Sequence, residues 1–168
     1  MSSKNFSYKL GGSMRAALLS FLLMVPSLFA QGGANCHHVG GSILTNFTDQ
    51  THTLGSATGD LKGGLGVNIL APPSPGPNGS IVFHNHHQWV TESGETILFA
   101  DADATAFPTP APGLLATSYL DGVTITGGTG RYSGASGKIA VFGAVDLGKQ
   151  ELILRYEGQV CIRPVSTD

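Results

Sequence analysis

The sequence predicts an all-β protein built from short antiparallel strands. After residue 30 glycine is dense, because 22 of the 24 glycines lie there. Short apolar or alternating runs recur between clusters of Gly, Asp, Asn and Ser, which is the pattern of strands joined by tight turns. No segment of that region repeats apolar residues at the helical period over a helical length, so we expect no long amphipathic helix.

The first thirty residues differ from the rest and predict a cleavable signal peptide. Lys4, Lys9 and Arg15 supply positive charge with no acidic residue among them, and a mostly apolar run follows over residues 16–25. A basic head followed by a short apolar run is the layout of a secretory signal. The run is too short for a stable membrane-spanning helix, which needs about 20 apolar residues. A buried core helix is the alternative.

Removal of residues 1–30 would leave residues 31–168 as one domain, secreted or periplasmic. Ala30 and Ala34 are the two alternatives for the last residue of the signal. The remaining domain would carry six basic and eleven acidic residues, a net charge near −5. This charge argues against binding to nucleic acid and, after signal cleavage, against docking on an anionic membrane.

Strands are predicted wherever short apolar or alternating runs lie between turn residues. They cover residues 39–47, 53–61, 64–70, 81–92, 95–106, 114–121, 123–126, 137–146 and 151–163. Two proline-rich stretches, residues 71–79 and 107–113, are predicted to be loops, because proline cannot donate a ladder hydrogen bond. Long loops in small barrels often rim a pocket, and a rigid connector is the alternative.

The two cysteines, Cys36 and Cys161, lie near the two ends of the domain. In an exported protein such a pair is more often bridged than free, and no Cys-x-x-Cys motif supports a redox or metal role. Alternation of apolar and polar residues places both cysteines on the outward sides of the first and last strands. A disulfide between those strands would close the sheet into a barrel, which removes exposed edges.

Residues 126–137 read Thr-Gly-Gly-Thr-Gly-Arg-Tyr-Ser-Gly-Ala-Ser-Gly. They resemble the Gly-Gly-Thr-Gly-x-(Phe/Tyr)-x-x-Ala-x-Gly signature of the allene oxide cyclase and dirigent family of barrels. Residues 58–63 and 154–161 resemble a turn and the final strand of bacterial secreted relatives of that barrel. The resemblance covers residues 36–163 in outline.

This resemblance implies an antiparallel up-and-down β-barrel of about eight strands with an apolar interior. It also implies a homo-oligomer, often a trimer. The plant members of the family guide the cyclisation of an unstable epoxide or the coupling of radicals. Only the structural turn matches in this chain, so no activity and no working residue is carried over.

The most unusual local feature is the run His-Asn-His-His at residues 84–87. If residues 93–94, Ser-Gly, form a two-residue hairpin turn, two histidines face two aspartates on one side of the hairpin. The facing pairs are His84 with Asp103 and His86 with Asp101. Imidazole and carboxylate suit zinc, so these four residues could bind a divalent metal. The alternative is two solvated cross-strand pairs on the outer wall.

The other side of the same hairpin predicts a ligand site inside the barrel. It carries Phe83, Asn85, His87 and Trp89, opposite Ala104, Ala102, Ala100 and Leu98. Large residues opposite small ones suit a tapered interior. We expect Asn85, His87 and Trp89, with Tyr156 of the last strand, to bind a small apolar ligand. The alternative is a hydrogen-bonded core histidine.

Three functions follow from these observations. The first is a secreted module that binds a small apolar ligand. The second is a cyclase or isomerase, suggested by the resemblance and by a His87 that could transfer protons near neutral pH. The third is a non-catalytic structural barrel with a solid core and an apolar outer patch that includes Ile97 and Phe99. No phosphate loop, esterase elbow or zinc-protease motif is present, so no catalytic residue is assigned and no cofactor is expected.

Overall fold

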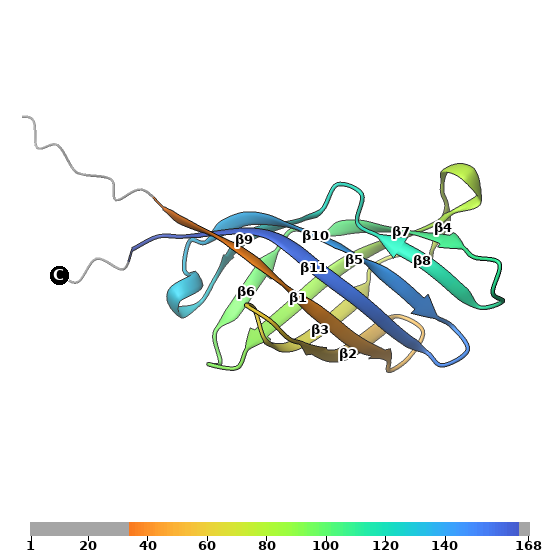
Figure 1. The fold of residues 1–168 in the computed structure, drawn as a ribbon, viewed down its shortest axis with the longest axis horizontal. Helices are drawn as coiled ribbons and strands as arrows, with labels where there is room; N and C mark the ends of the chain where they lie inside the picture. The colour runs from red at the N-terminus through yellow and green to blue at the C-terminus, as the bar shows by residue number, and fades with distance from the viewer. Residues whose placement is uncertain (1–33, 165–168) are drawn as a thin grey trace, which may run out of the picture. The chain divides into compact units, whose positions relative to one another are not determined.

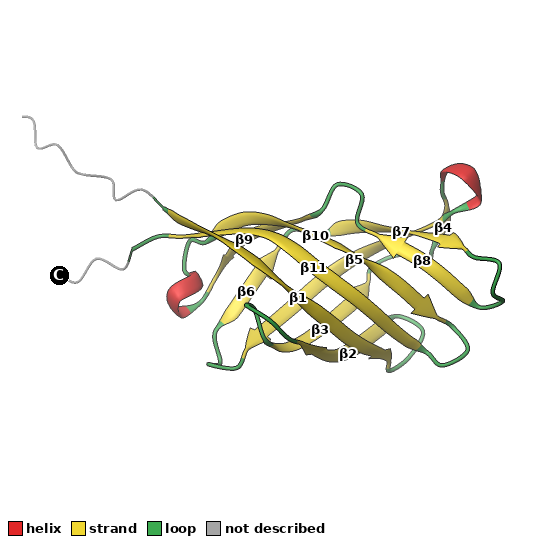
Figure 2. Ribbon diagram, viewed as in Figure 1, coloured by secondary structure: helices red, strands yellow, loops and turns green. Residues whose placement is uncertain are grey.

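The computed structural model describes residues 34–164, which form a closed antiparallel β-barrel (Figures 1 and 2). The residues of the predicted signal peptide lie outside the described residues. The strands are β1 (Asn35–Phe47), β2 (His52–Ala57), β3 (Gly63–Ile69), β4 (Ser74–Pro75), β5 (Ile81–Thr91), β6 (Thr96–Phe99), β7 (Ala102–Pro108), β8 (Leu114–Ser118), β9 (Val123–Gly128), β10 (Ser136–Asp146) and β11 (Glu151–Ile162). Two short 3-10 turns are η1 (Pro77–Gly79) and η2 (Gly130–Tyr132). Between residues 34 and 164 no helix is long and apolar enough to cross a membrane.

The sheet closes because its first and last strands pair with each other. β1 pairs with β11 along nearly its whole length, and β11 also pairs with β10. β6 and β7 both pair with β5, whereas β8 and β9 both pair with β10. β6 and β7 together fill one position around the wall, and β8 and β9 together fill the next. The barrel therefore has eight strand positions, and these positions follow the order of the chain. The predicted fold class is confirmed.

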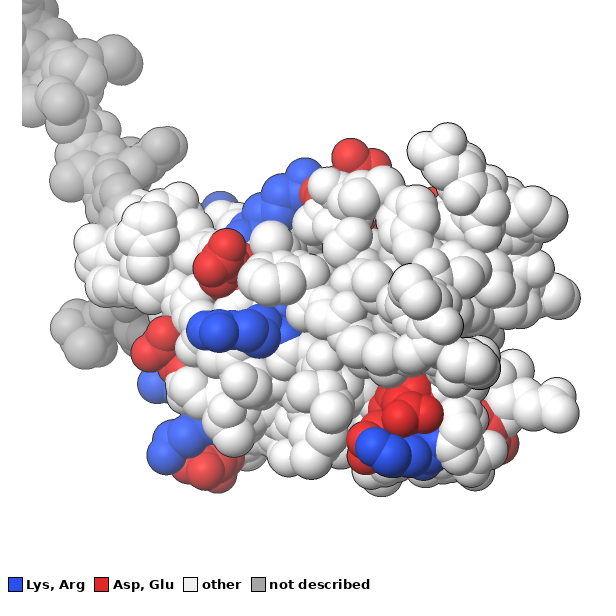
Figure 3. Space-filling view, turned by 45° about the vertical axis from the view of Figure 1, so that its right-hand side comes forward, with Lys and Arg blue, Asp and Glu red and all other residues white. Residues whose placement is uncertain are grey.

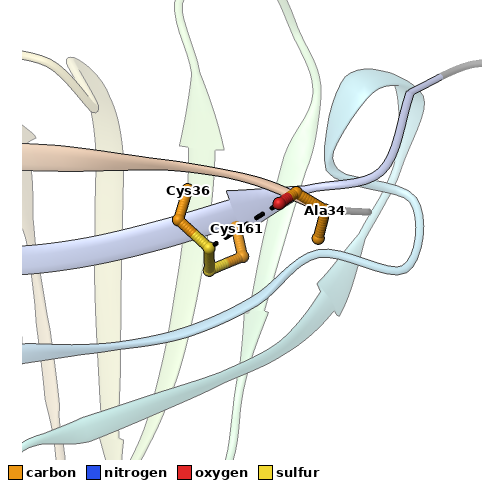
Figure 4. Close-up of a disulfide and its surroundings, with 3 residues drawn as sticks. All are labelled: Ala34, Cys36 and Cys161. Atoms are coloured by element: carbon orange, nitrogen blue, oxygen red, sulfur yellow. Dashed lines mark hydrogen bonds between the residues drawn. A yellow bond between two sulfur atoms is a disulfide. The ribbon is translucent and has the colours of Figure 1, made fainter. Parts of the chain in front are cut away.

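Cys36 and Cys161 face each other across β1 and β11 and form the predicted disulfide, with an S–S distance of 2.06 Å (Figure 4). The Cys36 sulfur also lies 3.9 Å from the Ala34 carbonyl oxygen. A bridged sulfur has no proton to donate, so this is a packing contact. The disulfide therefore joins the two strands whose pairing closes the barrel.

Alternation along the strands separates the core from the outer wall, as predicted for the last strand. On β11, Leu154, Tyr156 and Val160 are buried, whereas Ile153 is 57% exposed. Successive side chains of a strand point to opposite faces. Most buried apolar side chains of the long strands therefore meet in a main core inside the barrel, and Ala106, Leu115 and Val145 form a second, smaller cluster.

The hairpin between β5 and β6 differs from the predicted register. The Thr91 N–H donates to the Glu95 carbonyl oxygen at 2.8 Å, and Gly94 has a φ of 83°. The loop therefore has three residues and not two, and its last residue is a glycine in the left-handed region. Trp89 pairs with Ile97, and the prediction that Leu98 faces Trp89 is wrong.

This one-residue shift changes which side chains of β6 point inward, because strands alternate. Ile97 is fully buried and Phe99 is 6% exposed, whereas Leu98 is 53% exposed. The predicted outer patch that included Ile97 and Phe99 is therefore wrong. Between β5 and β7 the predicted register holds, and Asn85 pairs with Ala102.

The glycine motif at residues 126–137 forms the connection from β9 to β10. Gly130 and Gly134 have φ values of 56° and 66°, a region that favours glycine. A Cβ on Gly128 would lie 2.2 Å from the carbonyl oxygen of Thr96 on β6. The motif thus has a structural explanation, since it makes a tight turn and a close approach of two backbones.

The first proline-rich stretch is more regular than predicted. Ser74 and Pro75 form the short strand β4 against β5, and the turn η1 follows. In the second stretch, residues 107–108 continue β7. These loops are therefore partly tied to the barrel wall.

Charged side chains on the outer wall form several pairs of opposite sign. On the face drawn in Figure 3, basic and acidic residues lie beside each other. Lys62 Nζ lies 2.7 Å from Glu92 Oε2, and Arg131 Nε lies 3.0 Å from Glu95 Oε2. The Lys62–Glu92 pair is exposed on both sides and contributes little to stability, whereas the Glu95 side chain is only 22% exposed.

Candidate ligand-binding site

A cavity of about 240 Å³ lies inside the barrel. Asn85, His87 and Trp89, three of the four residues predicted to bind a ligand, line it, and most of the other lining side chains are apolar. An engineered apolar cavity of about 150 Å³ holds benzene, so by proportion this one holds about ten non-hydrogen atoms. The cavity is therefore large enough for a small organic molecule.

The cavity reaches the surface at one end of the barrel. Gln50 in the β1–β2 loop and Leu147 in the β10–β11 loop both line it, and both are exposed. These two loops lie at the same end of the barrel, on the right in Figure 1. A ligand could therefore enter between them without opening the sheet.

Trp89 and Tyr156 pack together deep in the core. Their ring centroids lie 5.4 Å apart, and Trp89 Nε1 donates to the Leu61 carbonyl oxygen at 2.7 Å. The Tyr156 hydroxyl accepts from the Leu61 N–H at 2.8 Å and donates to the Thr58 carbonyl oxygen at 2.9 Å. Tyr156, the fourth predicted ligand residue, does not line the cavity but holds the β2–β3 turn against the core.

Three polar side chains form a cluster in the otherwise apolar wall. Asn85 and His87 alternate along β5 and both face inward, as the sequence pattern predicts. Asn85 Nδ2 donates to Tyr119 Oη at 2.9 Å, and His87 Nε2 lies 2.8 Å from the same oxygen. Tyr119 was not predicted, although Leu115, Thr117 and Tyr119 alternate as inward residues and could have indicated it.

Neither His87 nor Tyr119 carries a charge near neutral pH. Burial lowers the pKa of the His87 imidazole to about 4; the nearby His86 lowers it further and Asp101 raises it. Burial raises the pKa of the Tyr119 hydroxyl well above its usual value. Among the described residues that line the cavity, none is Asp, Glu, Lys or Arg. An ion would therefore lose its hydration there without gaining a counter-charge, which is costly.

The proton positions in the cluster follow from counting donors. Tyr119 Oη has one proton and already accepts a hydrogen bond from Asn85. Among the described residues, His87 Nε2 is the acceptor within reach of that proton, so the proton goes to Nε2 and the proton of the neutral imidazole is on Nδ1. This arrangement satisfies the Tyr119 hydroxyl, but Asn85 Oδ1 and His87 Nδ1 remain without a hydrogen-bond partner.

Four buried side-chain nitrogen or oxygen atoms within residues 34–164 have no hydrogen-bond partner. They are Thr45 Oγ1, Thr53 Oγ1, Asn85 Oδ1 and His87 Nδ1. All four residues line the cavity. An unsatisfied buried donor or acceptor costs about 1–3 kcal/mol, so these side chains have hydrogen-bonding capacity that a ligand could use.

The four residues predicted as metal ligands lie on the outer wall as two separate pairs. His84 Nδ1 lies 2.7 Å from Asp103 Oδ1, and His86 Nδ1 lies 2.7 Å from Asp101 Oδ1. All four side chains are between 42% and 63% exposed. In the part of the chain that the structure describes, no group of three or more His, Cys, Asp or Glu side chains could hold a metal ion.

No family model matches this chain, and no curated protein matches it. A solved structure described as "Structure of the pterocarpan synthase dirigent protein GePTS1" is similar to it, with 16% identity and a TM-score of 0.35. The likeness covers 84% of this chain and 98% of that one. Similarity at this level carries no argument about the activity of this chain. The relation to the allene oxide cyclase and dirigent family therefore stays a prediction from the glycine motif.

Proposed function

We propose that this protein is an exported β-barrel that binds a small, uncharged, mostly apolar molecule in its interior. The observation that carries the proposal is the cavity of about 240 Å³, lined mainly by apolar side chains and reaching the surface beside Gln50 and Leu147. Burial of apolar ligand surface contributes about 25 cal/mol per Å². The absence of charged side chains among the described lining residues favours an uncharged ligand.

Export is the second part of the proposal. It is supported by the signal-like pattern of residues 1–30 and by the Cys36–Cys161 disulfide, because disulfides persist in oxidising compartments. The intact mass of the protein recovered from the periplasm or medium tests it. We expect a mass that lacks the first 30 or 34 residues, and a mass that includes Met1 would contradict export with cleavage.

A native mass spectrum tests ligand binding. The protein is purified from an oxidising host and measured before and after denaturation. We expect an additional organic mass that leaves when the protein unfolds. The variant Ala104→Leu fills part of the cavity, because Ala104 lines it, and should lose the extra mass. Ala116→Leu is the matched control on the exposed wall and should keep it.

Bare protein that also fails to take up any apolar probe would contradict the binding proposal. Equal retention of the extra mass by Ala104→Leu and Ala116→Leu would also contradict the proposal, because it would place the bound molecule outside the barrel.

A second candidate function is an isomerase or cyclase that acts on the bound molecule. The observation that favours it is the neutral His87–Tyr119 pair within the cavity wall, where a buried imidazole can accept or donate a proton. The recovered ligand is incubated with the protein, and its isomers are separated by chromatography. Conversion that His87→Gln removes while binding persists would support this function, and a ligand returned unchanged would exclude it.

A further inference from the structure

We infer that the ligand carries an uncharged hydroxyl group, and that His87 and Asn85, both held by Tyr119, recognise it. This inference rests on the proposed function and names the chemical class of the molecule bound. The observation behind it is that His87 has an unpaired N–H donor and Asn85 an unpaired carbonyl acceptor, and that these two residues lie two apart on β5. Both side chains line the cavity.

The donor and acceptor are fixed by their other hydrogen bonds. Because Tyr119 Oη lies 2.8 Å from His87 Nε2 and gives its proton to it, the N–H of His87 is at Nδ1, which is buried and has no partner. Because Asn85 Nδ2 donates to the same phenol oxygen, Asn85 Oδ1 is left as a buried acceptor without a partner. A ligand that satisfies both atoms must accept one hydrogen bond and donate another.

A hydroxyl group is the smallest function that does both. An ether oxygen accepts but cannot donate, so it would leave Asn85 Oδ1 unpaired. A hydrocarbon would satisfy neither atom. A carboxylate would bring a charge into a wall where no described lining residue carries a counter-charge. An alcohol is therefore favoured over an ether or an acid of the same size.

The single tryptophan makes the test direct. The chain has one Trp, Trp89, and it lines the cavity, so its emission reports on the interior alone. The probes are 1-octanol, its isomer 1-methoxyheptane, and octanoate, which are close to the expected ligand size and do not absorb where tryptophan does. One lost hydrogen bond to a buried group corresponds to about a tenfold change in affinity. We expect 1-octanol to bind at least about tenfold more tightly than either of the others.

Variants separate recognition from packing. Asn85→Leu keeps the volume but removes the acceptor, so it should remove the preference for 1-octanol over 1-methoxyheptane while the ether still binds. His87→Phe removes the donor and provides a second test if Asn85→Leu does not fold. The control is Thr117→Val, because Thr117 also lines the cavity but its hydroxyl already donates to the Thr105 carbonyl oxygen at 3.2 Å. That control should keep the preference.

The outcomes distinguish this inference from the function on which it rests. Equal binding of 1-octanol and 1-methoxyheptane would overturn the hydroxyl inference and leave an apolar binding site. Tightest binding of octanoate would overturn it in favour of an anion. If no probe changes the Trp89 emission and the native mass spectrum shows bare protein, the proposed function fails as well.

Discussion

The imidazole of His87 loses most of its water when the barrel closes around it. Its ordinary pKa of 6.5 falls to about 4 in the folded protein, mainly through burial. Between these values the unfolded chain binds more protons than the folded one, so stability falls as the pH drops through this window. The buried His87 therefore lowers the stability of the barrel in acid, although its side chain faces the interior.

This shift predicts a pH dependence that belongs to one residue. We expect the free energy of unfolding to be about 2 kcal/mol lower at pH 5 than at pH 7 on account of His87. Urea unfolding at both pH values measures it, and His87→Gln should lose that part of the difference. Equal pH dependence in the wild type and the variant would contradict the assignment.

The sequence predicts the two residues of this cluster that lie on β5, but not Tyr119. Alternation along residues 84–87 predicts that Asn85 and His87 point inward, and that prediction is confirmed by their burial. Tyr119 lies more than thirty residues later, and its approach depends on how β8 and the following turn cross the barrel. Alternation after residue 114 indicates that Tyr119 points inward, but its contact with Asn85 and His87 joins distant segments and has no local sequence signal.

Close contacts between strands set the limits on glycine replacement along β1. A Cβ on Gly41 would lie 1.9 Å from the Thr58 carbonyl oxygen and 2.7 Å from Tyr156 Cε1. We expect Gly41→Ala to lower the free energy of unfolding by roughly 2 kcal/mol or more, because the turn after β2 must move. Urea denaturation of each variant measures the change.

Gly64 on β3 is the matched control. A Cβ there would meet nothing within 4 Å. Gly64→Ala should therefore be neutral or slightly stabilising, since it restricts the unfolded chain without a clash. Similar losses in Gly41→Ala and Gly64→Ala would contradict the packing described between β1 and the β2–β3 turn.

The disulfide joins β1 to β11 at the line where the sheet closes. It links residues 125 positions apart, a loop for which the chain-entropy model gives an upper value of about 5 kcal/mol. We expect replacement of both Cys36 and Cys161 by Ala to lower the free energy of unfolding by about 2–4 kcal/mol. Chemical denaturation compares the variant with the oxidised protein. An unchanged unfolding free energy would show that strand pairing alone holds the two ends.

Register within an element was the least predictable feature of the hairpin. Ser-Gly at residues 93–94 is compatible with a two-residue turn, whereas the structure has a three-residue loop with Gly94 in the left-handed region. A slip of one residue exchanges the two faces of a strand. Compared with the predicted register, Ile97 therefore points inward and Leu98 points outward. The pairs of β5 with β7 were correct because the shift does not extend beyond β6.

For the whole molecule, the barrel class and an interior ligand site could be predicted, but the size of the cavity could not. Alternating strands, glycine turns and two terminal cysteines together indicate closure, and closure is what the structure has. Whether the interior is solid depends on the summed volumes of side chains from many strands, such as Ala104 opposite Phe83. The sequence pattern marks these residues as inward but does not state how much space they leave.

The central claim is that the barrel interior contains an accessible apolar cavity. Diffraction from a crystal pressurised with xenon tests it most directly, because xenon enters apolar cavities. We predict xenon density, or density for a ligand already in place, inside the barrel beside Ala104, Tyr119 and Val141, which line the cavity. An interior filled by side chains, with no density for xenon or ligand at that position, would contradict the claim.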